Sequence, residues 1–170
     1  MVQYIYIISG PCGVGKSTIA KEVAKLVPNC ALVEGDHLLH FYDDHSMLPW
    51  EERLWIAWKN LVDVTKNLLQ HKLNVVIDFV VEDELKWFCT YFAHLEIQFK
   101  YVVLRADKET LVDRITERGD TYMVDRSLFL LNKLENETPF NEPFLYDTTS
   151  KQPADIVKDI IEQKRFELTI

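Results

Sequence analysis

One segment constrains the fold of this 170-residue chain more than any other. Residues 10–17 read Gly-Pro-Cys-Gly-Val-Gly-Lys-Ser, and they match the phosphate-loop pattern G-x-x-x-x-G-K-[ST] at every fixed position. A short apolar run rich in β-branched and aromatic residues precedes the loop, and apolar residues at helical spacing follow it. Because this strand–loop–helix order is the setting in which the pattern holds nucleotide phosphates, the segment predicts a nucleotide site at a strand–helix junction.

The rest of the chain alternates between strand and helix patterns. Apolar runs predict strands at residues 4–8, 30–33, 75–77, 99–104 and 144–146. Helices are expected after the loop, over 50–70, around 111–115 and from 153 onward. Strands separated by helices form a parallel sheet covered on both faces, and we expect one domain over residues 1–170. Ligands of such sheets bind beyond the carboxyl ends of the strands, so the residues that directly follow each strand are candidates for the site.

Composition narrows the range of partners. The chain has 19 basic and 27 acidic residues, a formal charge of −8, which argues against a broad nucleic-acid surface. We find no signal peptide and no apolar run long enough to span a membrane. The three cysteines are far apart and lack zinc-ligand spacing, as expected of reduced thiols. We therefore expect a cytoplasmic protein that binds neither nucleic acid nor membranes.

The loop residues have separate chemical roles. Glycine allows the backbone to come close to a phosphate and to take positive φ, so that backbone N–H groups surround the anion. The Lys16 ammonium neutralises the β- and γ-phosphates of ATP, and the Ser17 hydroxyl is a ligand of Mg²⁺. The residues expected to contact the nucleotide here are Gly10, Cys12, Gly13, Val14, Gly15, Lys16, Ser17 and Thr18.

Two carboxylates follow predicted strands. Asp36 comes shortly after the second strand, where it can orient an acceptor hydroxyl and take its proton. The alternative for Asp36 is a helix N-cap, and either His37 or His40 could be the base instead. Asp78 directly follows the third strand and resembles a Walker B aspartate, which holds Mg²⁺ directly or through water. The alternative for Asp78 is a carboxylate in a turn.

Arginines gather in one later region. Arg114 and Arg118 are four residues apart and share a helix face, with Arg105 before them and Arg126 after them. Residues 119–121, Gly-Asp-Thr, break the helix and suggest a mobile flap. Arginines on a flap can close over ATP and stabilise the charge that spreads in the transition state. The alternative is surface arginines that pair with neighbouring acids.

These elements, taken in order, resemble the gluconate kinase and shikimate kinase branch of the small P-loop kinases, which is related to the nucleoside monophosphate kinases. Residues 35–40 resemble a G-D-x-L-H element, and Pro49-Trp50 resembles the Pro-Trp pair that opens a helix. Residues 114–118 resemble an R-x-x-x-R helix ending, and residues 146–150 resemble a late loop that borders the adenine. The similarity covers nearly the whole chain.

The resemblance implies a P-loop NTPase three-layer α/β sandwich with a five-stranded parallel sheet in the order 2-3-1-4-5 and a flap over ATP. It implies transfer of the γ-phosphoryl group from ATP, with Mg²⁺, to a hydroxyl of a small metabolite or drug-like acceptor. It places Arg114 against adenine and Arg118 at the phosphates, so Lys16, Asp36 and Arg118 are the candidate catalytic residues. The alternative is a nucleotide-binding module without kinase activity that acts through a partner. Monomer and homodimer both remain open.

The acceptor region departs from gluconate kinases, which place basic residues between the G-D-x-L-H and Pro-Trp elements. Residues 41–48 contain no Lys or Arg and include two acids, and His40 lies four residues after Asp36 instead of three. Arg53 could substitute from the next helix, while aromatic residues could line an apolar pocket wall. We therefore expect a neutral or cationic hydroxylated acceptor instead of gluconate. The aromatic candidates are Phe41, Tyr42 and Trp50, and the polar candidates are Asp36, His37, His40 and Arg53.

Overall fold

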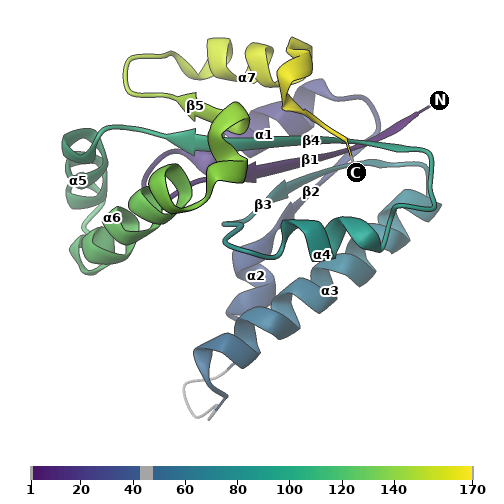
Figure 1. Ribbon diagram of the computed structural model, residues 1–170, viewed down its shortest axis with the longest axis horizontal. Coiled ribbons are helices and arrows are strands. Elements are labelled where there is room, and N and C mark those ends of the chain that lie inside the picture. Colours follow the sequence, from purple (N-terminus) through teal and green to yellow (C-terminus); the bar gives the residue numbers. More distant parts are fainter. Residues whose placement is uncertain (1, 43–47, 170) are drawn as a thin grey trace.

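The computed structural model describes residues 2–42 and 48–169 of the chain. A central sheet lies between two layers of helices, with α1 and α7 on one face and α3 and α4 on the other (Figure 1). In chain order, the elements are β1 (Gln3–Ser9), α1 (Lys16–Leu26), β2 (Cys30–Glu34), α2 (Gly35–Leu39), α3 (Trp50–Gln70), β3 (Asn74–Asp78), α4 (Leu85–Thr90), β4 (Ile97–Arg105), α5 (Lys108–Glu117), η1 (Thr121–Met123), α6 (Val124–Asn132), η2 (Lys133–Glu137), η3 (Pro139–Phe144), β5 (Leu145–Asp147), α7 (Pro153–Glu162), η4 (Lys164–Phe166) and β6 (Glu167–Leu168).

The sheet has the predicted order β2-β3-β1-β4-β5, and these five strands are parallel. The fold expected from the resemblance is therefore confirmed. One feature was not predicted: the two-residue strand β6 pairs antiparallel with β4 and makes the sheet of the described residues six-stranded. The fifth strand also begins one residue later than expected, because Phe144 still belongs to the 3-10 turn η3.

The central strand β1 is covered on both faces, as its uninterrupted apolar pattern predicts. Ile5 and Ile7 join the core beneath α3 and α4, whereas Tyr6 and Ile8 join the core beneath α1 and α7. All four side chains are buried. Successive side chains of a strand point to opposite faces, so this single strand anchors both helical layers.

The tryptophans of the long helix α3 divide between core and surface. Trp58 is fully buried and packs against the rings of Phe79 and Phe88, with centroids 5.2 and 5.7 Å away. Trp55, by contrast, is 41% exposed and lies against the ring of Trp87, with centroids 4.4 Å apart.

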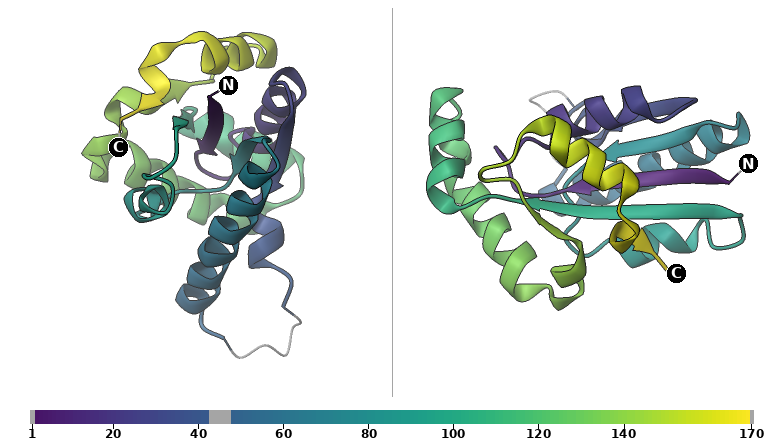
Figure 2. Two further views of the ribbon diagram at one scale, coloured as in Figure 1. Left: turned by 90° about the vertical axis from the view of Figure 1, so that its right-hand side faces the viewer. Right: turned by 90° about the horizontal axis from the view of Figure 1, so that it is seen from above.

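The carboxyl ends of the parallel strands point toward α5 and α6, and the view from above shows the same arrangement (Figure 2, right). Helix α2 and the amino-terminal end of α3 lie at the same end of the sheet. The loop before α1 and the residues after β2 and β3 therefore converge in space. The fold thus brings together the segments in which the sequence predicted a site.

Candidate active site

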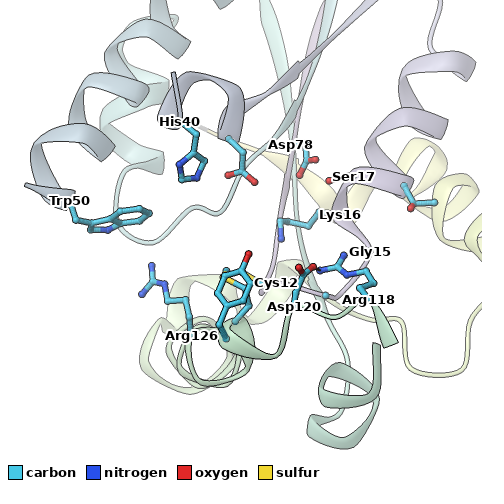
Figure 3. A pocket seen from close by; sticks show the side chains of 15 residues that line it. Cys12, Gly15, Lys16, Ser17, His40, Trp50, Asp78, Arg118, Asp120 and Arg126 are labelled. Atoms are coloured by element: carbon cyan, nitrogen blue, oxygen red, sulfur yellow. Dashed lines mark ion pairs between the residues drawn. The ribbon is translucent and has the colours of Figure 1, made fainter. Parts of the chain in front are cut away.

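A cavity of about 750 Å³ lies at the carboxyl ends of the strands. Its walls come from the phosphate loop, the end of β3, helix α2, the first residue of α3 and the segment from Arg118 to Arg126. In Figure 3, Ser17 and Asp78 lie on one side of this space, while Trp50 and Arg126 lie on the other, with Lys16 between them. One cavity therefore joins the predicted phosphate site to the predicted acceptor site.

The phosphate loop has the geometry that its glycines allow. Gly15 is the N-cap of α1 with φ of 100°, a backbone conformation that other residues rarely adopt. Lys16 Nζ donates to the Pro11 carbonyl oxygen at 2.9 Å, which holds the ammonium within the loop. On the other side of the loop, Ser127 Oγ of α6 donates to the Cys12 carbonyl oxygen at 2.6 Å. Helix α6 thus holds the phosphate loop through this hydrogen bond.

Asp78 is a buried carboxylate at the end of β3, opposite Ile8 of β1 and Glu34 of β2 in the strand register. Burial raises its pKa, and the negative charges of Asp36 and Glu34 add to this effect. The Ser17 hydroxyl and the Lys16 ammonium act in the opposite direction and lower the pKa. A divalent cation beside Asp78 would offset the cost of burying this charge.

The donor set at Asp78 fits Mg²⁺. This ion takes hard oxygen ligands and usually binds through one or two carboxylates, water and the phosphates of a substrate. The Asp78 carboxylate and the Ser17 hydroxyl are such oxygens, and both line the cavity beside Lys16. Within residues 2–42 and 48–169, no three His, Cys, Asp or Glu side chains are grouped to hold a metal without a substrate.

Asp36 lies in the first turn of α2 and lines the cavity together with His40, one turn later. The N-cap interpretation of Asp36 is wrong, because Glu34 occupies the cap position and makes no side-chain capping bond. His37 lies one residue farther around the helix: its side chain is 80% exposed, and its Nδ1 is 3.4 Å from Glu34. The structure brings Asp36 and His40 to the cavity and leaves His37 outside it.

The position directly before Asp36 has room only for glycine, Gly35. A Cβ atom at this position would overlap the ring of Phe79, which is buried against Trp58. We expect Gly35→Ala to lower the free energy of unfolding by about 1–3 kcal/mol, as overpacking in a core does. Chemical denaturation would measure the change. The additional change Phe79→Leu should restore part of the loss, and no rescue would contradict the assignment of the clash.

Arg53 does not line the cavity. Its guanidinium lies 5.6 Å from the ring centroid of Tyr42 and 6.0 Å from that of Trp50, and its Nη2 is 3.5 Å from His40 Nδ1. It therefore supports the residues behind the cavity wall. Phe41 and Tyr42 stack on each other at 5.0 Å and also lie outside the wall, whereas Trp50 forms part of it. Residues 43–47 of the predicted acceptor segment lie outside the described residues.

The arginines take up distinct positions. Arg118, the C-cap of α5, lines the cavity and lies 3.4 Å from Asp120. Arg114 donates to the Val14 carbonyl oxygen at 3.4 Å and lies in a separate hollow of about 200 Å³, formed with Thr148 and Lys151. The Arg118 N–H donates to the Arg114 carbonyl oxygen at 3.3 Å, so the helical spacing predicted for the two arginines is kept, although their side chains line different cavities. Both cavities include residues of the phosphate loop.

Arg126 also lines the cavity, and an ion pair fixes it there. Glu82, whose side chain is 15% exposed, pairs with Arg126 and with Lys133 at 3.1 Å. Arg105 pairs with Glu135 at 3.0 Å and with Asp147, and it lies away from the cavity. Sequence reasoning did not identify Glu82, because its partner Arg126 is 44 residues away and no local pattern marks the pair. It also missed Asp120, Tyr122 and Met123, which line the cavity.

Comparisons with known proteins agree with this fold. The sequence profile of the family described as "AAA domain" matches residues 7–138. No curated protein sequence matches the chain. Among solved structures, the Deinococcus radiodurans tunicamycin resistance protein is similar, with 16% identity, a TM-score of 0.65 and coverage of 94% of each chain.

Two further solved structures share the fold. A gluconokinase from Sinorhizobium meliloti has 16% identity and a TM-score of 0.64, covering 91% of this chain and 87% of its own. A sugar kinase from a Janibacter species has 14% identity and a TM-score of 0.64, with coverage of 95% and 93%. At such identities the likeness concerns the fold. None of the helices in the described residues is both long and apolar enough to cross a bilayer.

Proposed function

This chain belongs to the AAA domain family, and from that premise we propose that it is an ATP-dependent kinase that phosphorylates a hydroxyl of a small molecule. One observation carries the proposal. The phosphate loop with Lys16 and Ser17 opens into the same cavity as Asp36 and His40, so a γ-phosphate and an acceptor hydroxyl can meet there. The similar folds of a gluconokinase and a sugar kinase support this assignment.

In the proposed reaction, the loop amides and Lys16 hold the β- and γ-phosphates of ATP, and Arg114 lies toward the adenine. Mg²⁺, held by Ser17 and Asp78, would supply positive charge to the phosphates. Asp36 orients the acceptor hydroxyl and takes its proton as the hydroxyl oxygen bonds to the γ-phosphorus. The bond from that phosphorus to the bridging oxygen breaks, and ADP leaves. Arg118 stabilises the charge on the transferring group.

The proposal is tested by measuring ADP formation with pooled acceptors. The pools are sugars, sugar acids, nucleosides, amino-sugar alcohols and tunicamycin, the last chosen because of the structural likeness to a tunicamycin resistance protein. Stimulation of ADP formation by any pool supports the kinase. ATP binding without stimulation by any of them would favour the alternative, a nucleotide-binding module that acts through a partner.

We also propose one domain over residues 1–170, a cytoplasmic location and a monomer or homodimer.

Arg118→Ala is expected to lower kcat by about a hundredfold or more, with a much smaller change in ATP affinity. Arg118 is the C-cap of α5 and lines the cavity, and we expect it to act mainly when the flap closes. The matched comparison is Arg114→Ala on the same helix, which should mainly weaken ATP binding. Calorimetric ATP titration and steady-state kinetics separate these effects. Equal losses of ATP affinity and turnover in Arg118→Ala would contradict a transition-state role.

A further inference from the structure

A second hollow, of about 340 Å³, adjoins the candidate active site. We call it the side hollow. It shares Trp50 and Arg126 with the main cavity, so these two side chains form the boundary between the two spaces. In Figure 3, both lie at the end of the main cavity away from Ser17, where the acceptor is expected. An acceptor larger than one sugar ring could therefore continue past Trp50 into the side hollow.

Three large aromatic rings line the side hollow and are open to solvent. Trp50, Trp55 and Phe129 are 44%, 41% and 51% exposed. Trp55 lies against the ring of Trp87, with centroids 4.4 Å apart, and Lys59 Nζ lies 5.6 Å from the Trp55 ring centroid. The Arg126 guanidinium lies 5.3 Å from the ring centroid of Phe129, so cations already lie against these rings. Aromatic faces attract cations through their quadrupole and offer apolar area to the flat face of a ring. The hollow therefore offers preformed stacking surfaces beside the predicted reaction centre.

The polar lining of the side hollow is mainly acidic. Four carboxylates line it, against one cation, Arg126. That cation already pairs with Glu82, which also binds Lys133 behind the wall. Asp83 pairs with Lys133 as well, so Glu82 and Asp83 both have cationic partners. The carboxylates are Glu51, Glu82, Asp83 and Glu84.

The acceptor end of the main cavity also carries a carboxylate. It presents Asp36 and His40, and Arg53 lies behind the wall against Tyr42 and Trp50. A carboxylate on the acceptor would meet Asp36 and an Arg126 that is already paired with Glu82, while the Arg53 guanidinium lies against aromatic rings behind the wall. An ammonium group would meet carboxylates together with aromatic faces, and both attract cations.

On the basis of the proposed kinase function, we propose that the acceptor is a positively charged hydroxylated molecule of more than one ring, of the amino-sugar glycoside class. Its reacting hydroxyl lies at Asp36, and a second ring bearing an ammonium group crosses Trp50 into the side hollow. Trp50 and Trp55 stack against this second ring, and Glu51 pairs with the ammonium group. The side hollow thus sets the charge preference of the kinase.

The first experiment varies charge on one carbon skeleton. Steady-state kinetics with gluconate, glucose and glucosamine compare a negative, a neutral and a positive six-carbon acceptor, and a two-ring amino glycoside tests size. We expect kcat/KM to rise in that order, with the two-ring compound at least about tenfold above glucosamine. Calorimetric titration of the same compounds into the ADP-bound protein provides a readout independent of turnover. Gluconate equal to or better than glucosamine in kcat/KM or affinity would overturn the inference, as would binding of none of the four.

The second experiment uses matched variants. Glu51→Gln should raise KM for the two-ring compound about threefold to fivefold, the size of one exposed ion pair, and leave KM for glucose and ATP unchanged. Glu52→Gln, the neighbouring acid that does not line the side hollow, is the control. Equal effects of the two variants would place the ammonium group elsewhere and overturn the assignment. Loss of phosphoryl transfer to every acceptor, in this set and in the pools, would instead reject the proposed function itself.

Discussion

Replacing Lys16 by alanine is expected to reduce phosphoryl transfer by about a thousandfold or more and to remove tight Mg-ATP binding. The Lys16 ammonium is held within the loop by the Pro11 carbonyl oxygen and faces the cavity where the phosphates would lie. Without it, no ammonium group neutralises the negative charge of the β- and γ-phosphates at that position. The fold should survive, because the side chain contributes to no hydrophobic core cluster.

Lys25→Ala provides a control on the same helix. Lys25 lies near the end of α1, is 68% exposed and pairs with Glu22, so its loss should change neither turnover nor ATP affinity. Calorimetric titration with Mg-ATP and a coupled assay of ADP formation measure both quantities for the two variants. Unchanged ATP affinity in Lys16→Ala would mean that the phosphate site lies elsewhere.

Asp36→Asn is expected to lower phosphoryl transfer by about a hundredfold or more while leaving ATP binding nearly intact. Asparagine keeps the shape of the side chain and a hydrogen-bonding oxygen but cannot accept the acceptor's proton. Asp36 lies in the first turn of a helix and serves as no cap, so its replacement should change stability little. Single-turnover measurements with a saturating acceptor would report the chemical step.

The control for this change is Asp155→Asn. Asp155 also lies in the first turn of a helix, α7, but it is exposed and lines none of the five cavities described in the structure. A fall in ATP affinity equal to the fall in turnover would reassign Asp36 as a ligand of the metal. Normal turnover in Asp36→Asn would remove it from the mechanism and leave His40 as the remaining candidate base in the cavity.

The phosphate loop could be predicted because its geometry is encoded in neighbouring residues. Gly15 needs positive φ, and the pattern itself specifies a residue that tolerates it. The places of Asp36 and Asp78 could be predicted because parallel strands end at one edge of a sheet, and both residues follow such strands. The strand order came from the family resemblance, and the structure confirms it.

The features that could not be predicted depend on which way a side chain points around its helix and on contacts between residues far apart in the sequence. One helical step separates Asp36, which faces the cavity, from His37, which faces solvent, and the sequence alone did not fix where α2 begins. Arg53 packs against rings from another segment, which no spacing rule indicates. The pair of Glu82 and Arg126 joins residues 44 positions apart. Such details are set by packing, which a local pattern does not contain.

The central claim is that the γ-phosphoryl group of ATP passes to an organic hydroxyl, and phosphorus NMR of the reaction mixture tests it most directly. With Mg-ATP and a stimulating acceptor, we predict a phosphate monoester signal that grows in equal amount with ADP and is absent with Lys16→Ala. The ester should form from ATP without a matching rise in inorganic phosphate. ADP accompanied only by inorganic phosphate, or no ADP above the level of Lys16→Ala with any acceptor, would contradict the account.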